Sequence, residues 1–295
     1  MSEIAIPPAL TVQTARGPVR CIVEGQGPAL LAIHGAMGGA EQSWLLARAL
    51  LGAAAPAWRV IAVARPGYPG TLLSLGRTPE AQADLHAAVL DALGEDRAVI
   101  AAVSAGGPSA LQLALRHPDR CRALTLVSAC TGRLATPPKV RRRMAVLGLL
   151  TAFPGVAAGL RSRGARRPMA SLERGVSDPV VRARALADPE ACALVRALSV
   201  SAMDGLRDRL PGTLNDTDRY ADLDRPPLDR ITTPLLAIHG TADPVVPLSH
   251  AEAVAVGVQD ADLLAIEGGE HLALFTHLQD IRGRTAAFLG ALQPA

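Results

Sequence analysis

A serine, an aspartate and a histidine lie far apart in the sequence, in an order that could assemble a nucleophilic hydrolytic site. Ser104 lies in the small-residue segment 102–107, AVSAGG, and Asp243 and His271 follow toward the carboxyl end. A serine hydroxyl is a weak nucleophile at neutral pH unless a histidine takes its proton and a third group fixes the tautomer of that histidine. The set predicts Ser104 as nucleophile, His271 as general base and Asp243 as the acid that orients the histidine.

The residues around the serine form a variant of the G-x-S-x-G pattern, with Ala102 at the first glycine position. In that pattern the serine occupies a strained turn between a strand and a helix, where only small neighbours fit. We expect the backbone amide of Ala105 to face a reacting carbonyl oxygen at the start of the helix. The glycine-rich loop 34–39, HGAMGG, lets the backbone approach a ligand closely, and we assign the Ala36 amide as the second oxyanion donor.

Strand-like and helix-like segments alternate through the first half of the chain and again after residue 231. This alternation is typical of successive βα units in a mostly parallel sheet. We expect strands at residues 19–24, 29–33, 60–64, 98–103, 123–127, 235–238 and 262–266, and helices at 41–51, 78–93, 105–116, 248–256 and 272–289. The expected fold class is α/β, a mostly parallel sheet flanked by helices, with an inserted and mainly helical lid.

The alternation stops between residues 133 and 230, where proline-interrupted helical segments follow one another. We place the lid at 133–230 and the two parts of the core at 1–132 and 231–295. Open α/β sheets carry ligand chemistry at the carboxyl ends of their strands, and His34, Ser104, Asp243 and His271 all fall at such ends in this assignment. The candidate residues should therefore meet at one edge of the sheet.

Four segments in this order resemble the α/β-hydrolase superfamily. They are the His34-Gly35 loop, the Ser104 elbow, residues 239–247 (HGTADPVVP) and residues 268–272 (GGEHL). The resemblance covers nearly the whole chain outside the lid. It implies that Asp243, before Val-Val-Pro, is the triad acid and that the histidine after Gly-Gly is the base.

The composition of the 295 residues indicates a compact globular protein, because 49% are hydrophobic and 19% are charged. A net charge of +3 and 2% aromatic residues do not favour nucleic-acid binding. The four cysteines have no CxxC spacing, and the first ten residues lack a secretory pattern, so we expect reduced thiols and a cytoplasmic protein. No metal motif such as HExxH occurs, and we expect neither a metal nor a cofactor.

One apolar stretch, 144–160, lies between basic residues and contains Pro154. It is shorter than the roughly 20 residues that span a bilayer, so no transmembrane segment is predicted. Two short helices, buried or half-buried, are expected instead. The apolar residues of 144–153 would then suit a substrate with an apolar acyl or alcohol group.

The first half of the lid is strongly basic, because residues 133–184 contain twelve arginines or lysines against Glu173 and Asp178. Such charge usually marks solvated helix faces. The alternative is attraction of an anionic substrate, an acyl carrier or a membrane surface. The acidic stretch 216–229 is expected to pair with this basic region.

The leading hypothesis is hydrolysis of a carboxylic ester, lactone or thioester of an apolar small molecule. Two alternatives stay open: cleavage of a carbon-carbon bond in a diketone-like compound by the same triad, and a non-hydrolytic binding protein on the same fold. Dinucleotide binding, with Arg65 facing a 2′-phosphate, is disfavoured because Gly35, Gly38 and Gly39 do not have GxGxxG spacing.

Overall fold

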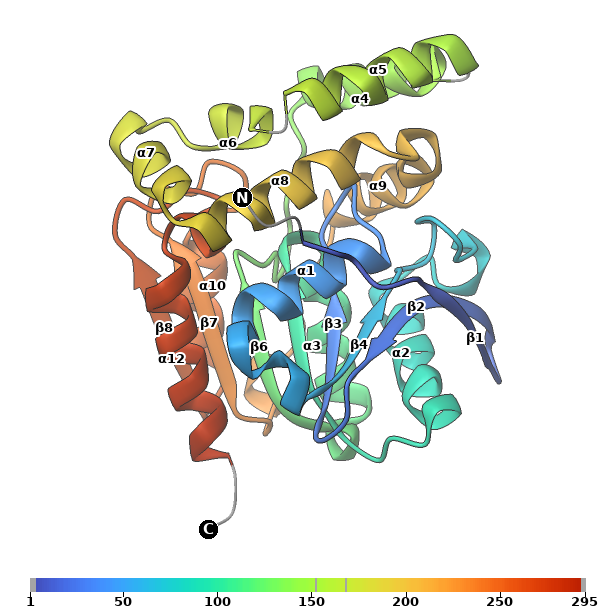
Figure 1. The fold of residues 1–295 in the computed structure, drawn as a ribbon. Helices are drawn as coiled ribbons and strands as arrows, with labels where there is room; N and C mark the ends of the chain where they lie inside the picture. The colour runs from blue at the N-terminus through green and yellow to red at the C-terminus, as the bar shows by residue number, and fades with distance from the viewer. Residues whose placement is uncertain (1–3, 152, 168, 293–295) are drawn as a thin grey trace.

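A computed structural model describes residues 4–151, 153–167 and 169–292 (Figure 1). Its strands form one sheet: β1 (Leu10–Thr14), β2 (Gly17–Glu24), β3 (Ala29–Ile33), β4 (Arg59–Val63), β5 (Ala98–Val103), β6 (Cys121–Val127), β7 (Leu235–Gly240) and β8 (Ala261–Ile266). The strand order is β1-β2-β4-β3-β5-β6-β7-β8.

The sheet is parallel from β4 to β8, and only β1 and β2 run antiparallel to their neighbours. The predicted α/β class with a mostly parallel sheet is therefore confirmed. Ile33 pairs with Ala102, and Val103 pairs with Val127, so the carboxyl ends of β3, β5 and β6 are level. The residues that follow these strands consequently emerge at one edge of the sheet.

Helices cover both faces of the sheet (Figure 1). The core helices are α1 (Ala40–Leu51), α2 (Pro79–Leu93), α3 (Gly107–Arg116), α10 (Ser249–Gly257), α11 (Ala273–Thr276) and α12 (Leu278–Ala291). Central strands such as β3 are buried at every position because helices pack on both sides of them.

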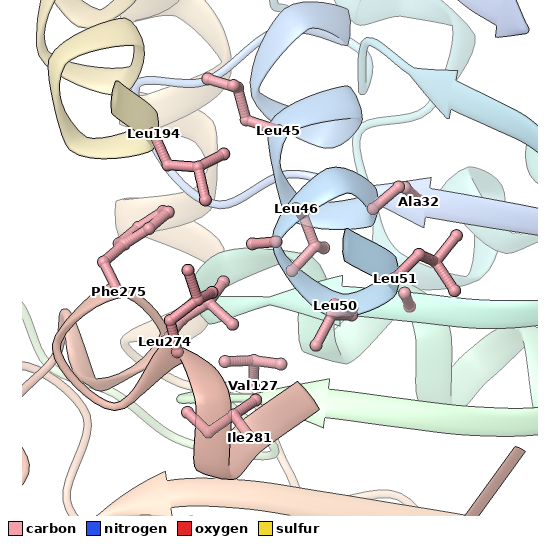
Figure 2. Packing of buried hydrophobic residues seen from close by; sticks show 14 of the residues in the cluster. Ala32, Leu45, Leu46, Leu50, Leu51, Val127, Leu194, Leu274, Phe275 and Ile281 are labelled. Carbon is pink, nitrogen blue, oxygen red and sulfur yellow. The ribbon is translucent and has the colours of Figure 1, made fainter. Parts of the chain in front are cut away.

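The core has two apolar layers, one on each face of the sheet. One layer packs α1 and α12 against side chains such as Ala32, and the other packs α2, α3 and α10 against side chains such as Leu31. Figure 2 shows Leu45 and Leu46 of α1 in the first layer, near Leu194 and Leu274. This layer therefore joins the sheet to the helices at its carboxyl edge.

Between β6 and β7 the described residues form six α-helices: α4 (Pro138–Thr151), α5 (Pro154–Arg166), α6 (Ala170–Gly175), α7 (Pro179–Ala187), α8 (Pro189–Met203) and α9 (Leu206–Tyr220). They lie over the carboxyl edge of the sheet, with α4 and α5 outermost (Figure 1). We call α4–α9 the cap helices. The division of the chain at 132/133 and 230/231 stays a prediction.

The structure adds one strand to the expected elements and changes two of the expected helices. The edge strand β1 was not predicted, because its residues do not form an apolar run. The helix after Ser104 begins at Gly107, since residues 104–106 form a 3-10 turn. The final helix is divided into α11 and α12 because His277 has a non-helical backbone (φ −130°, ψ 41°).

The expected burial of the helices in 144–160 is wrong. The two helices exist as α4 and α5, but Leu149 is 75% exposed and Phe153 is 63% exposed. These helices pack on α8 and α9 from one side only, and no layer of the described chain covers their outer side. Apolar periodicity indicates a helix but does not say whether a second layer is available to bury it.

Candidate active site

Ser104 lies in a strained turn at the carboxyl end of β5. Its backbone φ is +52°, in the left-handed region that non-glycine residues rarely adopt. The small neighbours are required by close approaches: a Cβ at Gly106 would lie 2.8 Å from the carbonyl oxygen of His34, and one at Gly35 would lie 2.9 Å from Cβ of Ser104. The elbow geometry expected from segment 102–107 is therefore present.

The structure brings the three residues of the predicted triad into one hydrogen-bonded line. His271 Nε2 lies 3.1 Å from Ser104 Oγ, and His271 Nδ1 lies 2.8 Å from Asp243 Oδ2. An ionised carboxylate can only accept, so Nδ1 carries the proton and Nε2 is free to accept the hydroxyl proton of Ser104. This is the arrangement that a general base needs.

Asp243 is held in place on both of its oxygens. Oδ1 accepts hydrogen bonds from the amides of Val245 and Val246, at 2.8 and 3.0 Å, and Oδ2 faces His271. Burial opposes its ionisation, but the hydrogen bonds from His271 and the two amides outweigh burial and hold the pKa of Asp243 below its ordinary value. The carboxylate is therefore charged and fixed beneath the imidazole.

Ala36 and Ala105, the predicted oxyanion donors, flank the serine. Ala36 lines the same pocket as Ser104, and Ala105 follows Ser104 in the 3-10 turn. Donation of their amides to an oxyanion stays a prediction. His34, two residues before Ala36, is fully buried and neutral, because burial and then Arg65 lower its pKa. Its Nδ1 donates to the Gly35 carbonyl at 2.6 Å, and its Nε2 accepts from the Arg65 amide at 2.9 Å.

A pocket of about 470 Å³ opens onto the serine and the histidine. Its walls come from α1, α8, the loop after β3 and the segments around Pro244 and Leu272. Among the described lining residues, the polar side chains are Gln42, Ser104 and His271, and most of the others are apolar. An uncharged, apolar group suits this pocket.

The apolar lining does not come from the segment that we expected. The described residues of 144–153 lie on α4 or, for Phe153, just after it, and none is among the lining residues, which include Leu45, Leu198 and Phe275. A larger cavity of about 580 Å³, lined by the amino-terminal segment, α1 and α8, has none of the three triad residues in its wall. The smaller pocket is therefore the candidate substrate site.

Sequence reasoning missed a buried ion pair beside the site. Arg65 and Asp216 are both buried, with Nη2 to Oδ2 at 2.6 Å, and the Tyr68 hydroxyl donates to the same Oδ2 at 2.6 Å. Burial disfavours the charge of Arg65, but Asp216 outweighs this effect and raises its pKa further. Arg65 is consequently engaged inside the protein and does not face a ligand phosphate.

Only part of the acidic stretch pairs with the basic part of the cap as predicted. Asp218 pairs with Arg141 of α4 at 2.7 Å, whereas Asp216 pairs with Arg65 of the core. A further link joins the cap to the histidine loop, because Glu270 Oε1 accepts from the amide and the hydroxyl of Ser177 at 2.5 and 2.8 Å. Because Glu270 immediately precedes His271, these hydrogen bonds connect the loop that carries His271 to the segment before α7.

The cysteine thiols are buried away from solvent. All four cysteines are buried and free, and burial raises the pKa of Cys130 to about 11. Within residues 4–151, 153–167 and 169–292, no three His, Cys, Asp or Glu side chains are grouped to hold a metal ion. In the same ranges no helix is both long and apolar enough to cross a bilayer.

Comparisons with known proteins show the family to which this chain is similar. A family model described as alpha/beta hydrolase fold matches residues 28–174. A pimeloyl-[acyl-carrier protein] methyl ester esterase of Aromatoleum aromaticum is 32% identical over 257 residues, which are 86% of this chain and 94% of that protein. An esterase of the same name from Neisseria meningitidis is 28% identical over 226 residues, 75% of this chain and 79% of that protein.

A solved structure extends the match over both parts of the fold. The alpha/beta hydrolase fold protein from Nakamurella multipartita superposes with a TM-score of 0.79 and 34% identity, over 96% of this chain and 99% of that chain. The chain therefore belongs to the α/β-hydrolase fold family and is a carboxylesterase-like hydrolase.

Proposed function

We propose that the protein hydrolyses a carboxylic ester, lactone or thioester through an acyl-enzyme on Ser104. The observation that carries the proposal is the hydrogen-bonded line from Asp243 through His271 to Ser104, with the serine in the wall of an apolar pocket. No other described nucleophile has a base and an orienting acid in this arrangement.

The proposed reaction has two half-reactions on the same three side chains. Ser104 Oγ attacks the carbonyl carbon while His271 Nε2 takes its proton, and the amides of Ala36 and Ala105 bind the oxyanion. The intermediate then expels the alcohol or thiol, which receives that proton. Water attacks the acyl-enzyme with the same base, and the acid is released.

Hydrolysis of an ester and carbon-carbon bond hydrolysis of a diketone-like compound both release a carboxylic acid, so the pocket walls fit either reaction. The described lining residues are mostly apolar and include no arginine or lysine, and an uncharged acyl or alcohol group suits them.

A fluorophosphonate probe tests the nucleophile and separates an enzyme from a binding protein on the same fold. Phosphorus is attacked by an activated serine and fluoride leaves, so we expect one label per chain, located on Ser104 by peptide mass spectrometry. Ser104→Ala should abolish the label, whereas Ser109→Ala, a buried serine in the following helix, should retain it. Absence of label, or label on another residue, contradicts the proposal.

The basic face of the cap supports a finer proposal about the substrate, that its acyl chain is presented by an acidic carrier. Two relatives are named as esterases of a pimeloyl-[acyl-carrier protein] methyl ester. In this chain, Lys139, Arg142 and Arg143 of α4 are exposed, and residues 138–167 contain no acidic side chain. Such a face attracts a negatively charged protein, mainly by raising its association rate.

Kinetics with two methyl esters of the same acid, one carrier-bound and one free, test whether a carrier presents the substrate. Arg142→Gln should lower kcat/KM for a carrier-bound methyl ester by roughly threefold to tenfold and leave the free methyl ester of the same acid unchanged. The effect should shrink as salt is raised, because screening weakens exposed charges. The control is Arg230→Gln, which removes an exposed charge near the amino end of β7. If the wild type had equal kcat/KM for both esters, the proposal that an acidic carrier presents the acyl chain would be wrong.

A further inference from the structure

We infer that cap helix α9 holds the oxyanion loop in its working conformation, with Thr213 as a positioning residue. This inference rests on the proposed function, because it concerns the loop that carries the Ala36 amide. Its starting point is Met37, the residue after Ala36, whose backbone φ is +57°. A left-handed methionine is unfavourable and persists only when surrounding contacts determine it.

Side chains bind both polar backbone groups of Met37. Its amide donates to Thr213 Oγ1 at 3.0 Å, and its carbonyl accepts from Gln42 Nε2 and Arg209 Nη1, each at 3.2 Å. The hydroxyl of Thr213 donates to the Arg209 carbonyl at 2.8 Å, so its lone pairs are available to the Met37 amide. Thr213 is 1% exposed, so its hydroxyl is shielded from solvent.

Helix α9 also holds, indirectly through Arg65, the two carbonyl groups that precede Ala36. Arg65 Nε donates to the His34 carbonyl at 2.9 Å, and Arg65 Nη2 donates to the Gly35 carbonyl at 3.2 Å. The guanidinium is in turn held by both oxygens of Asp216 on α9. The peptide groups before and after Ala36 are therefore fixed, directly or through Arg65, by one helix.

Helix α9 also reaches the second predicted oxyanion donor. The Tyr220 hydroxyl donates to the Ala105 carbonyl at 2.7 Å. The contacts come from one stripe of α9, whose members recur every three or four residues: Arg209, Thr213, Asp216 and Tyr220. A single face of a cap helix thus spans the two loops whose amides must bind the same oxygen atom.

This arrangement gives the cap a second task besides enclosing substrate. Oxyanion donors act only within a narrow distance of the developing charge, and a displacement of about 1 Å can cost about a hundredfold in rate. Loss of the α9 contacts lets Met37 relax toward an ordinary backbone conformation and turns the adjacent amide of Ala36. The loss should therefore appear in transition-state binding and not in ground-state binding.

The test replaces Thr213 with valine, which keeps the shape of the side chain and removes the acceptor. We expect Thr213→Val to lower kcat for an aryl ester by about tenfold to a hundredfold, with KM within about threefold of the wild type. The inhibition constant of a boronic acid, which forms a tetrahedral adduct on Ser104, should rise by the same factor as kcat falls. Thr213→Ser keeps the acceptor and should restore both values.

The control is Thr151→Val on α4. Thr151 is a buried cap threonine that also donates to the carbonyl four residues earlier, Leu147, at 2.8 Å, but has no contact with the oxyanion loop. If Thr213→Val matches Thr151→Val in kcat and boronate affinity, the inference is wrong. If Thr213→Val does not fold, Tyr220→Phe is used in its place. We expect the inhibition constant of the boronic acid to rise by the same factor in Tyr220→Phe, and an unchanged constant would contradict the inference. Retained activity in Ser104→Ala would instead refute the proposed function.

Discussion

Replacing Ser104 with alanine should lower kcat/KM for an aryl ester by at least about ten-thousandfold. The substitution removes the attacking oxygen and leaves the pocket and the backbone amides around it in place. His271 Nε2 then has no hydroxyl proton to take, and the remaining rate comes from water attacking a bound ester. Initial rates over a range of ester concentrations, together with the thermal unfolding midpoint of the variant, measure the effect.

The unfolding midpoint matters because Ser104 lies at the centre of a tightly packed turn. Alanine is smaller than serine and keeps the same backbone requirement at φ +52°, so we expect a change in midpoint of no more than a few degrees. Ser109→Ala in α3 removes a fully buried hydroxyl and should keep full activity. Activity of the Ser104 variant within tenfold of the wild type would exclude an acyl-enzyme on this residue.

The chemistry of the site could be predicted from sequence because each of its parts has a local signature. Small residues around Ser104, a Gly-Gly before the histidine and an aspartate before Pro244 are all constraints that act within a few residues. The apolar runs of the buried strands place these signatures at strand ends, and parallel pairing then brings the ends together. Residues far apart in the sequence therefore meet because parallel strands end at the same edge of the sheet.

The missed features depend on contacts that have no local signature. The pairing of Arg65 with Asp216 joins residues 151 positions apart, and nothing near either residue indicates the other. Likewise, the hydrogen bond from Met37 to Thr213 depends on where the cap helix rests on the core. Sequence patterns identify α9 as a helix but do not specify its docking on the oxyanion loop.

The exposed side of α4 illustrates the same point for packing. Its apolar residues suggested a buried helix, but in the structure α4 contacts α9 and α5, and Thr151 is its one buried residue among those described. The contrast with α9 separates the cap into two parts. α9 is bound to the core by a buried ion pair and by hydrogen bonds to both oxyanion loops, whereas α4 and α5 contact mainly other cap helices. Any opening of the cap to admit substrate is therefore expected to involve α4 and α5 before α9.

Replacing Asp243 with asparagine should lower kcat by about ten-thousandfold while leaving the fold intact. The reason lies in the direction of the hydrogen bonds. Oδ1 accepts from the amides of Val245 and Val246, so the asparagine oxygen must take this place and its NH₂ group must face His271 Nδ1. Nδ1 then has to accept, and the proton moves to Nε2, which faces Ser104. In that tautomer the imidazole can no longer take the serine proton.

Steady-state rates and fluorophosphonate labelling at fixed times measure the loss, because both require deprotonation of Ser104. The control is Asp222→Asn, an exposed aspartate beyond the end of α9 that should keep wild-type values of both. A similar fall in labelling rate and in kcat identifies activation of the serine as the damaged step, since pocket binding is untouched. If kcat of Asp243→Asn stayed within tenfold of the wild type, the orienting acid would have to be a different residue, and the line from Asp243 to Ser104 would be structural only.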